Sequence, residues 1–220
     1  LTLLIPGAND KGFAMTGSYS CMLLLSALIF DQASIEDKRA WVARAAKMGR
    51  DVVAREPQIK AWVNRDFDRV TYLGSASLSG LAREGQLKIL ELCAGRIATS
   101  FDSSMGYRHG PKSFVDDRTL VFDFVSNDPY TRQYDLDILN EIKGDEIAMA
   151  TVGVQQRTGS DFEGENFSFD GDGLLPEAYL ALPYVMFAQT VAINASIKVG
   201  NTPDTPSPTG TVNRVVKGVT

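Results

Sequence analysis

The feature that most constrains this chain is a regular change of hydrophobic period that begins after Asp68. Four short runs are rich in β-branched and aromatic residues, as strands are, at residues 69–74, 96–101, 119–126 and 146–154. Three other stretches have the apolar spacing of helices, at residues 78–93, 132–145 and 175–200. Strands that alternate with helices predict a parallel sheet with helices on both faces, a three-layer αβα domain over about residues 66–200.

Helices are expected before this domain. Residues 21–30 form an apolar run that Ser18 or Ser20 can cap as a helix. Residues 35–63 have the pattern of an amphipathic helical connector, interrupted by Pro57.

Two segments are predicted to be irregular. The tail after Gly200 has three prolines within six residues and should be extended. The acidic, glycine-rich residues 161–173 lack the ligand spacing of a calcium loop, which needs a Glu at the twelfth position. They are therefore expected to form a solvated loop.

Composition argues against several classes of partner. The 27 acidic and 22 basic residues give a net charge of −5, with no basic stripe for nucleic-acid phosphates or an anionic membrane. The apolar run 21–30 is too short to span a bilayer. Cys21 and Cys93 form no motif together, which indicates a reducing, cytoplasmic setting without a disulfide framework. One histidine and two distant cysteines cannot supply a zinc site, so no metal and no cofactor are expected.

Residues 74–80, GSASLSG, follow a predicted strand and open a predicted helix. Backbone N–H groups at a helix N-terminus, with the hydroxyls of Ser75, Ser77 and Ser79, make a good seat for a phosphate. A tight turn with a helix cap explains the same pattern, and the spacing matches neither a dinucleotide fingerprint nor a P-loop.

Glu84, Lys88 and Glu91 are spaced by four and then three residues, which places them on one helical face, opposite the apolar stripe. They are either a solvated face with ion pairs or a carboxylate base beside an ammonium group. The only histidine, His109, lies in the turn GYRHGP, and an imidazole can give and take a proton near neutral pH. No nucleophile elbow G-x-S-x-G is present.

Together these motifs resemble a known family. Residues 70–117 contain a serine loop, then E-G-x-L-K-x-x-E on a helix, then a strand and H-G-P, as in the second SIS (sugar isomerase) domain of tandem phosphosugar isomerases. The isomerase half of glucosamine-6-phosphate synthase has the same order. The stretches GYRHGPKSFVDD, VSNDPYTRQYDLDIL and GNTPDTPSPTGTVNRVV are similar to the galactosamine-6-phosphate deaminase/isomerase family, also described as tagatose-6-phosphate ketose/aldose isomerases.

The resemblance implies isomerisation of a hexose or hexosamine 6-phosphate through an enediol, with loss of ammonia from a 2-amino sugar. Galactosamine 6-phosphate would thus give tagatose 6-phosphate and ammonia. The resemblance assigns the proton shuttle between C1 and C2 to Glu91, its support to Lys88 and ring opening to His109. In the synthase family the matching histidine comes from a neighbouring subunit, so a homodimer or higher oligomer is expected.

The resemblance also divides the chain. Residues 1–34 look like the end of a first SIS domain, 35–65 a connector, 66–200 the second SIS domain and 201–220 an extended tail. The main phosphate loop would then lie upstream, which makes residues 74–80 structural or a secondary anion site, and little turnover is expected from the 220 residues alone.

Two further residues are candidate substrate contacts. Thr16 lies in the first of these parts. The synthase ends in a lysine followed by Ser-Val-Thr, whereas here Lys217 precedes Gly-Val-Thr and is one residue farther from the preceding asparagine.

Two other functions remain open, a non-catalytic sugar-phosphate-binding module and a structural half-domain left by truncation. A regulator would usually add a basic helix-turn-helix, which this sequence lacks, and would not need Glu91 together with His109.

Overall fold

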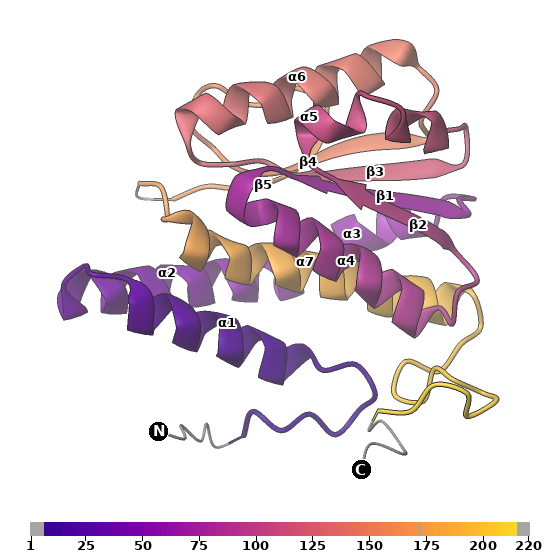
Figure 1. Cartoon of the computed structure of the whole chain (residues 1–220), viewed down its shortest axis with the longest axis horizontal. Coiled ribbons are helices and arrows are strands. Elements are labelled where there is room, and N and C mark those ends of the chain that lie inside the picture. Colours follow the sequence, from indigo (N-terminus) through magenta and orange to yellow (C-terminus); the bar gives the residue numbers. More distant parts are fainter. Residues whose placement is uncertain (1–6, 172, 215–220) are drawn as a thin grey trace.

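The computed structural model describes residues 7–171 and 173–214 (Figure 1). Three helices come first, α1 (Thr16–Phe30), α2 (Ile35–Ala54) and α3 (Glu56–Val63). The strands are β1 (Arg69–Gly74), β2 (Ala98–Asp102), β3 (Thr119–Phe124), β4 (Ala150–Gln156) and β5 (Glu165–Phe169). The remaining helices are α4 (Ser79–Leu92), α5 (Ser104–Tyr107), α6 (Pro129–Asp145) and α7 (Glu177–Lys198), with 3₁₀ turns η1 (Ala76–Leu78) and η2 (Pro111–Phe114).

The five strands are all parallel, in the order β2-β1-β3-β4-β5. Val70 of β1 pairs with Thr99 of β2 on one side and with Leu120 of β3 on the other. After β1 the chain passes through α4 to the edge strand β2, and it then returns to form β3 on the other side of β1. The carboxyl ends of β1 and β3 are therefore the topological switch point, where open α/β sheets bind their ligands.

Helices cover both faces of this sheet, with α4 and α7 on one face and α5 and α6 on the other (Figure 1). Helices α1, α2 and α3 each contact α7. Helix α3 also packs directly on the sheet, where the Trp62 ring meets that of Phe122 of β3. Helix α7 is long and apolar enough to cross a membrane, but 67% of its apolar window is buried inside the protein, as in the core helix of a domain. The predicted three-layer αβα fold is confirmed.

Close packing of α4 against β1 fixes the position of the helix that bears the predicted catalytic residues. Gly85 faces the ring of Tyr72, and a Cβ at Gly85 would lie 3.1 Å from that ring. The predicted apolar face of α4 is buried, including Leu81, Ala82 and Ile89. Helix α4 thus has little freedom to shift relative to the sheet, because interiors are close-packed.

The prediction of a solvated loop at residues 161–173 is wrong. Glu165–Phe169 form the edge strand β5, and Phe167 and Phe169 are buried in the main core. Acidic and glycine residues on both sides obscure an alternation that spans only five positions. Trp62 of α3 donates a hydrogen bond to Glu165 at 2.6 Å, so partners distant in sequence help to hold this strand.

The expected cap of the first helix is also corrected. Helix α1 begins at Thr16, so Ser18 lies inside its first turn and does not precede it. Asp10 accepts bonds from the backbone N–H groups of Gly17 and Ser18, both at 2.8 Å, and thereby satisfies donors that a helix start leaves free. The predicted interruption at Pro57 is confirmed, because α2 ends and α3 begins there, with the proline in the first turn of α3.

Candidate active site

The serine loop after β1 lies at the switch point, and its hydroxyls bond to other groups of the protein. Ser75 Oγ donates to Asp135 Oδ1 at 2.6 Å. Ser77 Oγ donates to Glu177, and Ser79 Oγ donates to the backbone oxygen of Ala76 at 2.9 Å. A phosphate at this loop would have to displace two carboxylates, which like-charge repulsion opposes.

Of these two carboxylates Glu177 is half-buried, whereas Asp135 is fully buried with Asp123 of β3. Sequence reasoning missed this acidic group. Asp135 of α6 also accepts bonds from the Ser104 hydroxyl and from the Ser126 N–H. Burial raises the pKa of Asp135. Burial, and then the neighbouring charge of Asp135, hold the pKa of Asp123 well above its usual range. Both carboxyl oxygens of Asp123 lack a hydrogen-bond partner in the described structure.

Helix α4 brings the predicted acid–base residues together. Lys88 Nζ lies 2.5 Å from Glu91 Oε2 and 3.3 Å from Glu84 Oε1. Lys88 is only 4% exposed, so the expectation that these residues face away from the apolar stripe is wrong for the lysine. Burial raises the pKa of Glu84, and the nearby charge of Lys88 opposes that rise. Tyr19 of α1 lies near Glu84, and burial, together with the Glu84 charge, raises the pKa of Tyr19 to about 12.

Glu91 also faces a cavity of about 620 Å³, which gives its carboxylate access to a small molecule. One wall is the outer side of α4, with Leu87 and Leu90. The other walls are Phe13 and the tail residues 206–209, 211 and 212. The cavity is large enough for a ligand the size of a phosphorylated hexose, since small-molecule sites begin at about 300 Å³.

The other predicted site residues lie elsewhere. His109 is exposed in the turn between α5 and η2, and α4 lies on the opposite face of the sheet from α5 (Figure 1). No hydrogen bond or ion pair joins His109 to Glu91 among the described residues. Thr16 lines a separate cavity of about 280 Å³ with Leu92 and Asp204. Lys217 is outside the described residues.

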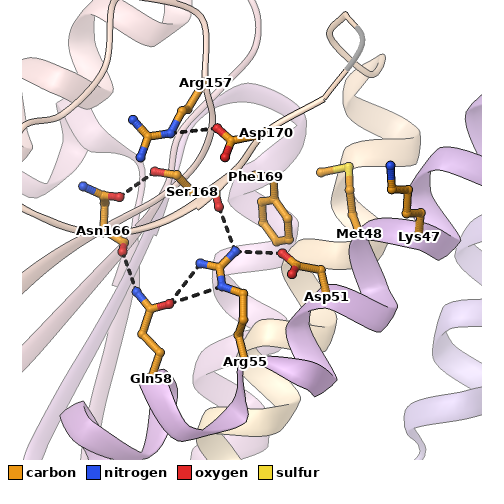
Figure 2. Close-up of a pocket in the computed structure, with 10 residues that line it drawn as sticks. All are labelled: Lys47, Met48, Asp51, Arg55, Gln58, Arg157, Asn166, Ser168, Phe169 and Asp170. Carbon is orange, nitrogen blue, oxygen red and sulfur yellow. Dashed lines mark hydrogen bonds and ion pairs between the residues drawn. The ribbon is translucent and has the colours of Figure 1, made fainter.

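Figure 2 shows a further cavity, of about 520 Å³, between α2 and the edge strand β5. Its polar groups bond mainly to one another. Arg55 donates to Asp51 at 2.7 Å and to the backbone oxygen of Ser168 at 2.9 Å, and it stacks over the Phe167 ring. Gln58 donates to the backbone oxygen of Asn166 at 3.0 Å. These side chains cover the free edge of the sheet, which protects an edge strand from pairing with other chains.

Known proteins of similar sequence and structure agree with the fold described above. No family model matches the chain. The chain, with its parallel αβα domain, is homologous along almost its whole length to SIS-domain phosphosugar isomerases. Within them it is 42% identical, over 230 residues, to D-galactosamine-6-phosphate deaminase AgaS of Escherichia coli, a match that covers 99% of this chain and 57% of that protein.

Solved structures agree. The chain superposes on tagatose-6-phosphate ketose/aldose isomerase from Escherichia coli with a TM-score of 0.83 at 37% identity, covering 93% of this chain and 55% of that one. A structure from Clostridium novyi superposes with a TM-score of 0.93 at 40% identity, covering 100% of this chain and 58% of that one. The chain therefore spans a little over half the length of the relatives that it matches.

Proposed function

We propose that the whole protein converts a hexosamine 6-phosphate to a ketose 6-phosphate and ammonia, with galactosamine 6-phosphate as the leading substrate. The observation that supports this most is the Glu84–Lys88–Glu91 cluster, whose outer carboxylate faces a cavity, in a chain 42% identical to a galactosamine-6-phosphate deaminase. The 57% coverage of that relative makes the activity a proposal about the complete enzyme.

The proposed chemistry moves two protons within the substrate and adds one water. A positioned group first opens the sugar ring, which is the role proposed for His109. Glu91 then takes the proton from C2 and returns it to C1, while a second proton passes from the C2 nitrogen to the C1 oxygen. The aldehyde with a C2 amine thereby becomes a C1 alcohol with a C2 imine. Water hydrolyses that imine to the ketone and releases ammonia. Lys88 Nζ, 2.5 Å from Glu91 Oε2, holds that side chain in place for the proton transfer.

The assembly is part of the proposal. Because α4 and α5 cover opposite faces of the sheet, His109 of one chain is badly placed to serve Glu91 of the same chain. Exposed apolar side chains on α4, β2 and α5 give a second copy an apolar face to pack on: Leu87, Leu90, Phe101 and Met105. We therefore expect a homodimer in which each active site combines Glu91 with His109 of the partner subunit.

The phosphate is proposed to bind in the part of the enzyme upstream of this chain, as the division into two SIS domains implies. The hydrogen bonds of Ser75 and Ser77 to carboxylates support that proposal. Thr16 and Lys217 stay candidate substrate contacts, and a cytoplasmic location stays a prediction.

The test is a substrate panel with the full-length protein. Galactosamine 6-phosphate, glucosamine 6-phosphate and the corresponding neutral aldose phosphates are each scored for ammonia release and for ketose formation. We expect ammonia and ketose in equal amounts from an amino sugar phosphate. Tight binding without either product would favour the non-catalytic sugar-phosphate module instead.

A further inference from the structure

The carboxyl end of α4, one residue beyond Glu91, has an unusual set of hydrogen bonds. A helix leaves its last four carbonyl oxygens without partners of its own. The Gly95 and Ala94 N–H groups bond to the oxygens of Leu90 and Glu91, at 3.0 and 3.2 Å. Leu92 is different, because in the described structure its carbonyl oxygen accepts hydrogen bonds from two side chains, one within α7 and one just after it. Ser196 Oγ donates to it at 2.6 Å and Asn201 Nδ2 at 2.8 Å.

The end of α7 places Asn201 for this contact. Gly200 adopts a left-handed φ of +68°, which ends the helix at a residue without a Cβ penalty. The Asn201 N–H then bonds to the oxygen of Ser196 at 2.9 Å, and the Gly200 N–H to that of Ile197 at 3.0 Å. These two bonds form a Schellman motif, a rigid helix end. The Asn201 side chain is therefore held at a defined place beside α4.

Asn201 also bonds to the tail. Its amide donates to the backbone oxygen of Pro206 at 3.0 Å, at the point where the tail becomes a wall of the Glu91 cavity. A neutral amide has two N–H donors, and both are used here, one on each side. On the other side of the tail, the Phe13 N–H bonds to the oxygen of Asp204 at 3.2 Å. The tail is thus fastened to the end of α4 by one side chain.

We propose that Asn201 is a positioning residue that holds the tail, residues 203–212, against the end of α4 and so gives the Glu91 cavity its shape. This inference rests on the proposed function, since it assigns that cavity to the substrate. Asn201 does not line the cavity and acts through the tail. Loss of its two donors frees the wall opposite α4, so the substrate loses contacts and water enters.

The test compares Asn201→Asp with Ser196→Ala in the full-length enzyme. Aspartate has the shape of asparagine but no N–H donor, so both bonds are lost. Ser196→Ala removes a bond to the same Leu92 oxygen and leaves the tail fastened, which makes it the matched structural control. For Asn201→Asp we expect KM for the amino sugar phosphate to rise about tenfold with a smaller change in kcat, as the loss of two hydrogen bonds predicts. Ser196→Ala should keep the wild-type KM.

Hydrogen exchange gives a readout that does not depend on turnover. The amides of Thr205 and Gly210 are bonded within the tail, at 3.1 Å each, and should exchange faster in Asn201→Asp only. The inference is overturned if Asn201→Asp has the KM and the exchange rates of the wild type. It is also overturned if Ser196→Ala shows the same rise in KM as Asn201→Asp. If the wild-type enzyme releases no ammonia from any substrate, the proposed function fails, while the exchange rates still confirm or overturn the fastening of the tail.

Discussion

Lys88 Nζ lies 2.5 Å from the carboxylate of Glu91 while its side chain is only 5% exposed, so a nearly buried ammonium holds the one carboxylate of the cluster that faces a cavity. Glu84 lies on the other side of the lysine at 3.3 Å. An ion pair with this little solvent is weakly screened, and removal of the lysine leaves two carboxylates without a counter-charge, whereas removal of Glu91 leaves Lys88 paired with Glu84.

Glu91→Gln in the full-length enzyme should lower the rate of solvent hydrogen exchange at C1 and C2 of the substrate by about 10²–10⁴-fold, the usual loss for a positioned acid–base group. Glutamine keeps the shape of the side chain and cannot take the proton, so binding of the sugar phosphate should be little changed. Exchange is followed by NMR in deuterated water. Glu36→Gln, on the exposed start of α2, is the control, and near-normal exchange in Glu91→Gln would contradict the assignment.

Lys88→Met should destabilise the protein by about 3 kcal/mol, because it leaves Glu84, whose side chain is only 11% exposed, without its partner. The matched control is Lys60→Met, which breaks an exposed pair with Glu56 at 3.2 Å and should change the free energy of unfolding little, because solvent screens exposed pairs. Urea unfolding measures both free energies. Equal losses would show that the burial of Lys88 has no energetic consequence.

Asp123→Asn should stabilise the protein relative to wild type at high pH. Burial, and then the charge of Asp135, raise the folded-state pKa of Asp123 above the unfolded value of about 3.9. The contribution of its neutral form to the stability of the fold is therefore fully present below the unfolded pKa, and it is lost as pH rises through the folded pKa. Asparagine keeps the neutral form at every pH, so the Tm difference from wild type should grow as the pH rises above the unfolded pKa of about 3.9.

Asp116→Asn is the control of opposite sign. The hydrogen bond from the Thr119 hydroxyl is the main cause that lowers the pKa of Asp116. The contribution of the ionised Asp116 to stability is therefore present above the unfolded pKa and is lost as pH falls through the folded pKa. Its Tm deficit should shrink in acid, whereas a pH-independent difference for Asp123→Asn would contradict the buried neutral carboxyl.

Ser75→Ala should reduce stability by about 1–3 kcal/mol, because Asp135 loses a donor, and should leave KM for the sugar phosphate unchanged. Ser79→Ala, whose hydroxyl bonds only within its own turn, should change neither quantity by much. Urea unfolding and steady-state kinetics of the full-length enzyme decide this. A KM rise of about tenfold or more in either variant would place the phosphate at this loop.

Mixed dimers test the proposal that the active site is shared between two subunits. Glu91→Gln and His109→Ala subunits are each expected to be inactive alone. After co-refolding, half of the dimers are mixed, and each mixed dimer contains one site with both native residues, so about a quarter of the wild-type activity should return. Activity that stays at the level of the single variants would show that Glu91 and His109 act within one chain or not together.

The alternation of strands and helices was readable from the sequence because it is local. β1 spans Arg69–Gly74, as its β-branched and aromatic run predicts, since strand pattern and burial coincide there on every residue but the first. The same reasoning failed for β5, where acidic flanks surround two core phenylalanines and the contacts that hold the strand come from α2 and α3.

For the candidate site too, part of the arrangement follows from the local sequence and part only from the tertiary structure. Spacing along one helix determined that Glu84, Lys88 and Glu91 lie within reach of one another, because residues three and four apart are neighbours on a helix. Tertiary packing decided that Lys88 is buried and that Glu91 faces a cavity closed by the tail, and it put α4 and α5 on opposite faces of the sheet. Helical spacing follows from backbone geometry within a few residues, whereas burial and cavity shape depend on which distant segments the fold packs together.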